Sequence, residues 1–123
     1  MTNKVTVPVE VNAQDLSDLL CNALEGGSNY WYVIDTEKSD KAGQEFWSDA
    51  PMNGGRIYFE TLEGDEHDGL AAWTLDRAGM LEGLAVMAAK FPRHMADFMA
   101  ENADATTGDV FLQCCLFGDV IYG

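Results

Sequence analysis

The hydrophobic pattern of the chain begins with a strict alternation. In residues 4–11 valine occupies every second position, and Thr6, Pro8 and Glu10 occupy the positions between the valines. A period of two places all the valines on one face, which predicts a half-buried strand. Because Pro8 has no N–H to donate, we expect this strand at the edge of a sheet.

An amphipathic helix is predicted next. Asn12 is suited to cap its start, with Asp15 three residues later as a shorter substitute for the usual glutamate, and Gly26 and Gly27 follow its end. Apolar side chains recur at intervals of three and four, the spacing that places them on one face of a helix. This face consists of Leu16, Leu19, Leu20, Ala23 and Leu24.

A second long helix is predicted to start at Thr74, a suitable N-cap, and to end before Pro92. Pro92 is also a favoured first residue for a short helix over residues 92–100, whose apolar side consists of Met95, Phe98 and Met99. The longer helix has Met80 and Met87 at the flanks of its core stripe. We expect that stripe to consist of Leu75, Ala78, Leu81, Leu84, Ala85, Ala88 and Phe91.

Strand patterns separate these two long helices. Residues 29–34, N-Y-W-Y-V-I, are aromatic and β-branched, which favours a strand. Because successive side chains of a strand alternate between its faces, either Trp31 or the pair of Tyr30 and Tyr32 faces away from the core. A hairpin is then predicted, with a strand, a turn and a second strand at residues 56–62, 63–69 and 69–73.

The longest irregular stretch covers residues 35–55 and is acidic. It contains the aromatic pair Phe46 and Trp47, and its carboxylates are Asp35, Glu37, Asp40, Glu45 and Asp49. Loops of this length inside a domain are often functional. Two interpretations remain open: the loop is a docking element with an aromatic anchor, or the two rings only hold the loop against the core.

The C-terminal stretch, residues 104–123, carries the strongest burial signal. Gln113 is the only polar residue among residues 110–117, and a helix that is apolar all round is normally buried on all sides. Either Thr106 or Thr107 can cap this helix, Asp109 would face its dipole in the first turn, and Gly118 would end it. A short strand is expected after it. We predict deep burial for Phe111 and Leu112.

Together these elements predict an α+β fold in a single domain over residues 1–123. The expected order is β-α-β-β-β-α-α-α-β, with an antiparallel sheet of three to five strands packed against three or four helices and a buried C-terminal helix. The alternative is a helix-dominated fold with one hairpin. The 47% hydrophobic fraction supplies a sizeable core.

The net charge says more about possible functions than the overall composition does. Seven Lys and Arg residues stand against 21 Asp and Glu residues, which gives a formal net charge of −14. Direct binding to nucleic acid or to an anionic membrane is therefore disfavoured, because phosphate contacts need a basic surface. Either the acidity only aids solubility, or an acidic face docks on a basic partner. Without a signal peptide or a membrane-length apolar run, a cytoplasmic location is expected.

No motif in the chain points to catalysis, a cofactor or a metal. G-x-S-x-G, H-E-x-x-H and the Walker loop are absent, so we expect no enzyme. The acidic turn at residues 63–69 lacks the spacing of a calcium loop, because His67 stands at the third ligand position counted from Asp65. Three cysteines, two of them adjacent, are interpreted as small buried hydrophobes, namely Cys21, Cys114 and Cys115.

Three segments carry a resemblance to a known family. They are L-E-G-G-S-N-Y-W at residues 24–31, T-L-D-R-A-G-M-L-E-G-L at residues 74–84, and the ending D-A-T-T-G-D-V-F-L-Q-C-C-L-F-G-D-V-I-Y-G. The chain resembles small acidic proteins of tailed phages and prophages, most of which carry no assigned function. The resemblance implies a phage accessory protein in a bacterial host and no catalytic residue. Relatives are mostly aliphatic at Cys114 and Cys115, which argues against a role for these thiols.

The function expected from charge and resemblance is inhibition of a host defence complex, such as a CRISPR effector or a restriction enzyme. Carboxylates would occupy the place of nucleic-acid phosphates on a basic surface, and aromatic rings would anchor the contact. One alternative is a nucleotide-binding protein with a pocket between residues 30–33 and the 35–55 loop, and another is an assembly protein. Self-association is compatible with the sequence. The expected partner-binding residues are Tyr30, Tyr32, Asp35, Glu37, Asp40, Glu45, Trp47, Asp49, Glu60, Glu63, Asp65, Glu66 and Asp68.

Overall fold

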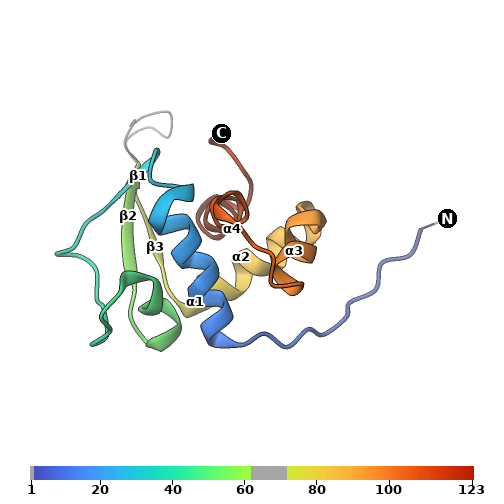
Figure 1. The fold of residues 1–123 in the computed structure, drawn as a ribbon, viewed down its shortest axis with the longest axis horizontal. Coiled ribbons are helices and arrows are strands. Elements are labelled where there is room, and N and C mark those ends of the chain that lie inside the picture. Colours follow the sequence, from blue (N-terminus) through green and yellow to red (C-terminus); the bar gives the residue numbers. More distant parts are fainter. Residues whose placement is uncertain (1, 62–71) are drawn as a thin grey trace.

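A three-stranded antiparallel sheet forms one side of the molecule (Figure 1). The computed structural model describes residues 2–61 and 72–123. Within them the strands are β1 (Tyr32–Ile34), β2 (Ile57–Thr61) and β3 (Ala72–Leu75), in the order β1-β2-β3. The antiparallel pairing of the predicted hairpin is confirmed, but its second strand runs from Ala72 to Leu75 where residues 69–73 were predicted, and its turn lies outside the described residues.

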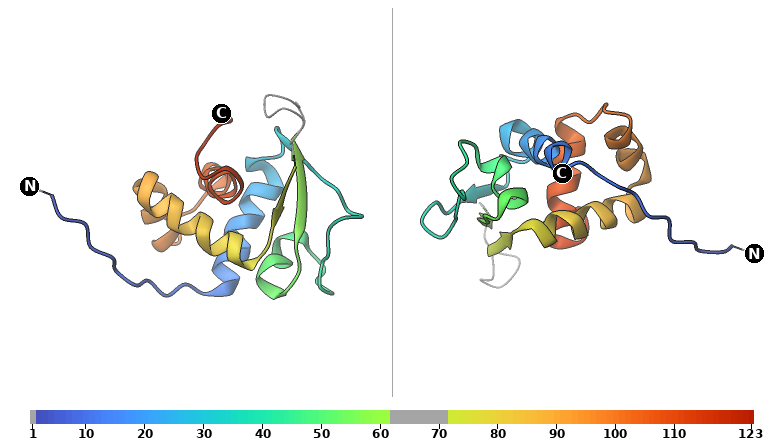
Figure 2. Two further views of the ribbon diagram at one scale, coloured as in Figure 1. Left: turned by 180° about the vertical axis from the view of Figure 1, so that it is seen from behind. Right: turned by 90° about the horizontal axis from the view of Figure 1, so that it is seen from below.

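Helices cover one face of this sheet. They are α1 (Ala13–Asn22), α2 (Arg77–Lys90), α3 (Pro92–Met99) and α4 (Ala105–Phe117), and α1 continues into a π-helical turn, η1 (Ala23–Gly27). Figures 1 and 2 show α4 between α1 and α2. The predicted α+β class is confirmed, and so is the buried C-terminal helix, since Phe111 and Leu112 of α4 are fully buried.

The core lies between the sheet and α4. Burial alternates along β2, where Ile57, Phe59 and Thr61 face inward and Tyr58 and Glu60 face outward. The inward side chains meet apolar residues from every helix. Among the buried helical residues are Leu16, Leu19, Leu20, Met80, Met87, Phe98, Phe111 and Leu112, and Trp31 joins them from the segment before β1.

Side-chain caps set where the helices begin. Asn12 accepts a hydrogen bond from the Gln14 N–H at 2.7 Å, as predicted for α1. The other two predicted caps are wrong: Asp76 caps α2 and Asp104 caps α4. Thr74 is unsuited to cap α2 because it lies within β3, and for α4 the carboxylate one turn earlier is the stronger acceptor.

The predicted N-terminal strand at residues 4–11 is wrong. This segment is extended but unpaired among the described residues, and it runs away from the body of the molecule (Figure 1). Three of its four valines lie in solvent, with Val5 81%, Val7 68% and Val9 50% exposed, whereas Val11 is half-buried against the core. The alternation correctly indicates a segment able to form a strand, but a strand also needs a neighbouring edge, and this fold provides none at that place.

The predicted core stripe of α2 is displaced around the helix. Leu81 is 44% exposed, whereas Met80 and Met87, expected at the flanks, are fully buried. The reason is the position of α4, which crosses α2 where Gly83 contacts Cys115. The buried face of α2 is centred on that contact, which a period of apolar residues in α2 alone does not reveal.

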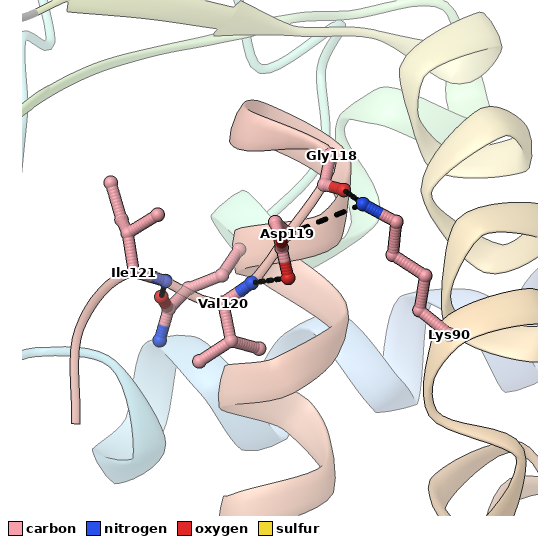
Figure 3. A network of polar contacts seen from close by, with 6 residues as sticks. Lys90, Gly118, Asp119, Val120 and Ile121 are labelled. Carbon is pink, nitrogen blue, oxygen red and sulfur yellow. Dashed lines mark hydrogen bonds and ion pairs between the residues drawn. The ribbon is translucent and has the colours of Figure 1, made fainter.

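The chain after α4 is not the strand that we predicted. Gly118 ends the helix in the left-handed conformation (φ 73°), as expected, and the tail then turns back along α4. The backbone N–H groups of Ile121 and Tyr122 both donate to Gln113 Oε1 at 2.8 Å. Lys90 of α2 holds the turn from outside by donating to the Gly118 carbonyl at 2.9 Å (Figure 3). A glutamine side chain therefore takes the place of a neighbouring strand.

Candidate functional site

A groove lies between the end of α1, the outer edge of β1 and the loop that follows β1. Its volume is about 330 Å³. We call it the aromatic groove, and the residues that line it are Cys21, Leu24, Glu25, Tyr32, Ile34, Lys41, Glu45, Phe46, Trp47 and Ser48. It brings together Tyr32 of the aromatic segment and several residues of the 35–55 loop.

The loop side of the aromatic groove is held by Lys41. The Lys41 ammonium lies 4.9 Å from the centre of the Trp47 ring, and its Nζ donates to the Glu45 carbonyl at 3.0 Å. Trp47 begins a short 3₁₀ turn, η2 (Trp47–Asp49), which packs against α1. The neighbouring Phe46 is left 58% exposed, so an apolar ring stands at the mouth of the groove.

The helix side of the aromatic groove is held by Tyr32. Its hydroxyl donates to the Leu24 carbonyl at 3.2 Å, near the end of the helical run. Burial, and then the charge of Glu25, raise the pKa of Tyr32 to about 12. The phenol therefore remains neutral and remains a hydrogen-bond donor at physiological pH.

The electrostatics of the aromatic groove favour a positive or neutral occupant. Glu25 and Glu45 are exposed carboxylates on its rim. Lys41 is the only cation in the described lining, and it is already engaged by the Trp47 ring and the Glu45 carbonyl. A phosphate would meet two carboxylates here and no uncommitted cation.

The partner-binding residues predicted from the sequence divide into groups. Tyr32, Glu45 and Trp47 meet in the aromatic groove. The carboxylates of Asp35 and Asp40 shape turns instead, by accepting from the backbone N–H groups of residues 37, 38 and 42. Such short side-chain to backbone bonds are typical of turns.

The remaining predicted residues lie either outside the aromatic groove or outside the described residues. Glu37 is exposed, Asp49 is the half-buried last residue of η2, and Glu60 is on the outer face of β2. Glu63, Asp65, Glu66 and Asp68 lie outside the described residues. A single acidic patch formed by the loop and the turn therefore remains a prediction.

Tyr30 belongs to a different constellation, centred on Asp109 of α4. The Asp109 carboxylate accepts hydrogen bonds from Ser28 Oγ at 2.7 Å, Tyr30 Oη at 2.8 Å and Trp31 Nε1 at 2.8 Å. Gln113 Nε2 adds a fourth at 3.1 Å. Partial burial, followed by the hydrogen bond and charge of Asp109, raises the pKa of Tyr30 to about 12.

This Asp109 cluster is structural: it joins α4 to the segment before β1, and the sequence pattern did not predict it. Asp109 was expected to face the helix dipole, but it lies beyond the first turn of α4 and points across to the segment before β1. Three of its four donors, Ser28, Tyr30 and Trp31, lie 78 to 81 residues away along the chain, so no local pattern signals these contacts. The only sequence signal for this contact is that the Asp109 carboxylate directly precedes the apolar run of residues 110–117.

A second, smaller hollow lies along α1, between this helix and the end of α3 with the chain that follows it. Its volume is about 170 Å³, and its lining consists of Asp15, Asp18, Leu19, Asn22, Phe98, Glu101 and Ala103. Its carboxylates do not converge on a point: in residues 2–61 and 72–123 there is no group of three or more His, Cys, Asp or Glu side chains placed to hold a metal ion.

The cysteines behave as hydrophobes in this fold. Burial raises the pKa of Cys114 to about 11 and that of Cys115 well above its ordinary range. Both thiols therefore stay protonated and unreactive at neutral pH. Cys21 is half-buried and lines the aromatic groove.

Comparisons with protein-family models, with curated proteins and with solved structures found no match to this chain. Among the described helices, none combines the length and the apolar character that crossing a bilayer requires.

Proposed function

We propose that the protein is an acidic binding protein that docks on a basic surface of another protein. The observation that carries the proposal is the lack of internal compensation of its charge. In the described residues the only ion pair is Lys90 with Asp119, at 3.5 Å and on the surface (Figure 3). Most of the carboxylates in the described residues therefore face solvent without an ion-pair partner, and their field is available to an external partner.

The aromatic groove supplies the anchor for such a contact. Phe46 stands exposed at its mouth, Trp47 lies inside, and Glu25 and Glu45 flank them. An arginine or lysine side chain of the partner fits there, because it would meet aromatic faces and two carboxylates together. Rings that lose water on binding provide most of the affinity, and the carboxylates provide orientation and speed.

The biological form that we propose is inhibition of a nucleic-acid-binding host defence complex. A protein of charge −14 competes directly with nucleic acid for a basic channel, because both present dense negative charge. Inhibition would then need no catalysis, only occupancy of the channel.

A second candidate is binding of a small molecule in the aromatic groove. Its volume of about 330 Å³ suits a small ligand. Because Glu25 and Glu45 rim the groove and Lys41 is engaged, the fitting ligand is an organic cation or a neutral aromatic compound and not a nucleotide.

The test uses a basic protein captured by this chain from a bacterial lysate, with binding rates measured across a salt series. We expect association to slow as salt rises, because exposed charges are screened within about 8 Å at physiological ionic strength. Phe46→Ala should speed dissociation, and Glu25→Gln with Glu45→Gln should slow association. The matched control is Glu82→Gln with Glu101→Gln, two exposed carboxylates outside the groove. Rates that ignore both salt and the groove variants contradict the proposal.

A further inference from the structure

The N-terminal arm, residues 2–11, is a strand-forming segment without a partner in its own chain. Val5, Val7 and Val9 share one face and are all exposed. In the described part of the chain, no hydrogen bond involves residues 2–11. Three valines on one face of an extended segment are costly to leave in water, so the arm gains by covering them.

Pro8 decides which edge of the arm can pair. The N–H and C=O of one residue in a strand point to the same side, and successive residues alternate. The even-numbered residues of the arm, which include Pro8, therefore form an edge that lacks one N–H donor. The opposite edge carries the complete amide groups of Val5, Val7 and Val9.

The outer edge of β1 offers the complementary set of groups. The Asp35 N–H donates to the Tyr58 carbonyl at 2.9 Å, and bonded pairs alternate along an antiparallel ladder. Val33 and Glu60 therefore form the next bonded pair, so the amide groups of Tyr32 and Ile34 point away from β2. In the described sheet β1 is an edge strand, and these amides face the side where the aromatic groove lies.

The two edges fit together in one direction only. In an antiparallel pair, residues that bond directly opposite each other place their side chains on the same face. The valines would then share the face of Tyr32 and Ile34, which is the face that lines the aromatic groove. Parallel pairing would place them beside Val33 on the exposed outer face and would leave them uncovered.

We propose that the N-terminal arm of a second copy of this chain adds antiparallel to β1 and buries its valines in the aromatic groove. The occupant is a second copy because the arm leaves α1 at the end opposite the groove and runs away from the body in every view (Figures 1 and 2). Five residues from Val5 to Val9 span about 13 Å, which is enough to follow a strand the length of β1.

This contact is apolar and main-chain in character, so it does not rest on the proposed function. Two copies of charge −14 repel each other, and salt should therefore strengthen self-association. A basic partner shows the opposite dependence. The sign of the salt effect separates the two contacts, although both use the aromatic groove and would compete for it.

The first experiment is sedimentation of the full chain over a concentration series. We expect a reversible dimer that Val7→Pro abolishes, since proline removes a donor from the pairing edge. The matched control is Thr6→Pro, which removes a donor from the edge that Pro8 already interrupts. Val7 and Thr6 are both exposed, so neither change disturbs the fold. A monomer at every concentration, or equal loss with both variants, overturns the proposal.

The second experiment locates the arm by oxidative cross-linking. Cys21 lines the aromatic groove, whereas Cys114 and Cys115 lie away from it in α4, so Val7→Cys should yield a dimer joined through residue 21 of the other copy. Thr6→Cys, which points to the opposite face, should link several-fold less, and Cys21→Ser in the Val7→Cys background should remove the link. Peptide mapping of a mixture of heavy-isotope and light chains identifies the copies. A link formed only within one chain, or no link at residue 21, contradicts the proposal that the arm binds a second copy.

Discussion

The indole Nε1 of Trp31 donates to Asp109 Oδ1 at 2.8 Å, and this bond joins the segment before β1 to the middle of the C-terminal helix. Trp31 is buried and also stacks on Tyr122 of the tail, with ring centres 5.2 Å apart and planes 7° apart. Asp109 and Gln113, one turn apart on α4, thereby fasten two distant segments onto the same helix face.

Removing the carboxylate of Asp109 should destabilise the protein. Asp109→Ala leaves the donors of Ser28 and Trp31 without an acceptor in a largely buried setting, at a cost of about 3 kcal/mol in the free energy of unfolding. Urea unfolding measures this change. Asp119→Ala is the control, because its only ion pair is exposed and should contribute well under about 1 kcal/mol. Equal losses of unfolding free energy in the two variants would show that the hydrogen bonds of Asp109 do not hold the two segments together.

The displaced stripe of α2 is tested by two neighbouring residues. Met80→Ala should cost about 2–5 kcal/mol, because the side chain is fully buried in the core. Leu81→Ala should cost far less, because Leu81 is substantially exposed. Thermal unfolding of the two variants tests this. A larger loss of stability in Leu81→Ala than in Met80→Ala would support the stripe that periodicity predicts.

Burial of Phe111 can be tested in the same way. Phe111→Ala should lower the free energy of unfolding by about 3–5 kcal/mol, since the ring is fully buried in α4 between the other helices. Phe46→Ala serves as the aromatic control because that ring is mostly in solvent. Unchanged melting in the Phe111 variant contradicts the central position of α4.

Gly108 should not tolerate a side chain. A Cβ there would lie 2.6 Å from the Ala23 backbone nitrogen and 2.7 Å from Asn22 Cβ, so α4 and the end of α1 would have to separate. Gly108→Ala should therefore destabilise the fold by about 1–3 kcal/mol even though alanine favours helices. Thr106→Ala, at an exposed position of the same helix, is the control. A stabilised Gly108→Ala protein would mean that the two helices do not approach this closely.

The phenol of Tyr32 predicts a loss of stability in alkali. Its pKa rises from 10.0 in the ordinary state to about 12 in the folded protein, so the folded state holds the proton more tightly than the unfolded chain. This contribution is complete below pH 10 and is lost as the pH rises toward 12. Tyr32→Phe should flatten the fall in unfolding free energy across this interval. An ionisation midpoint near pH 10, measured as the phenolate absorbance that Tyr32→Phe removes, would contradict the burial of this hydroxyl.

The aromatic groove shows how far a local pattern reaches toward a site. Aromatic and acidic residues cluster in two nearby segments of the sequence, and Tyr32, Glu45 and Trp47 of those segments line one groove. No sequence signal predicts Glu25 and Cys21 for the same groove, because they occupy positions of the helical run α1–η1 outside its apolar stripe. Their approach to β1 depends on how α1 lies on the sheet.

The sequence by itself determined the α+β class, the two strands of the hairpin, the glycine stop at Gly118 and the burial of Phe111 and Leu112, because periodicity, apolar runs and backbone preferences are local properties. Only the tertiary structure decided which face of α2 is buried, where Asp109 points, and that Gln113 holds the tail in place of a strand. Each of those outcomes depends on an approach between segments distant along the chain, and local preference carries no information about such an approach. The N-terminal arm marks the boundary between the two: its alternation specifies a strand, and only a neighbouring edge can complete it.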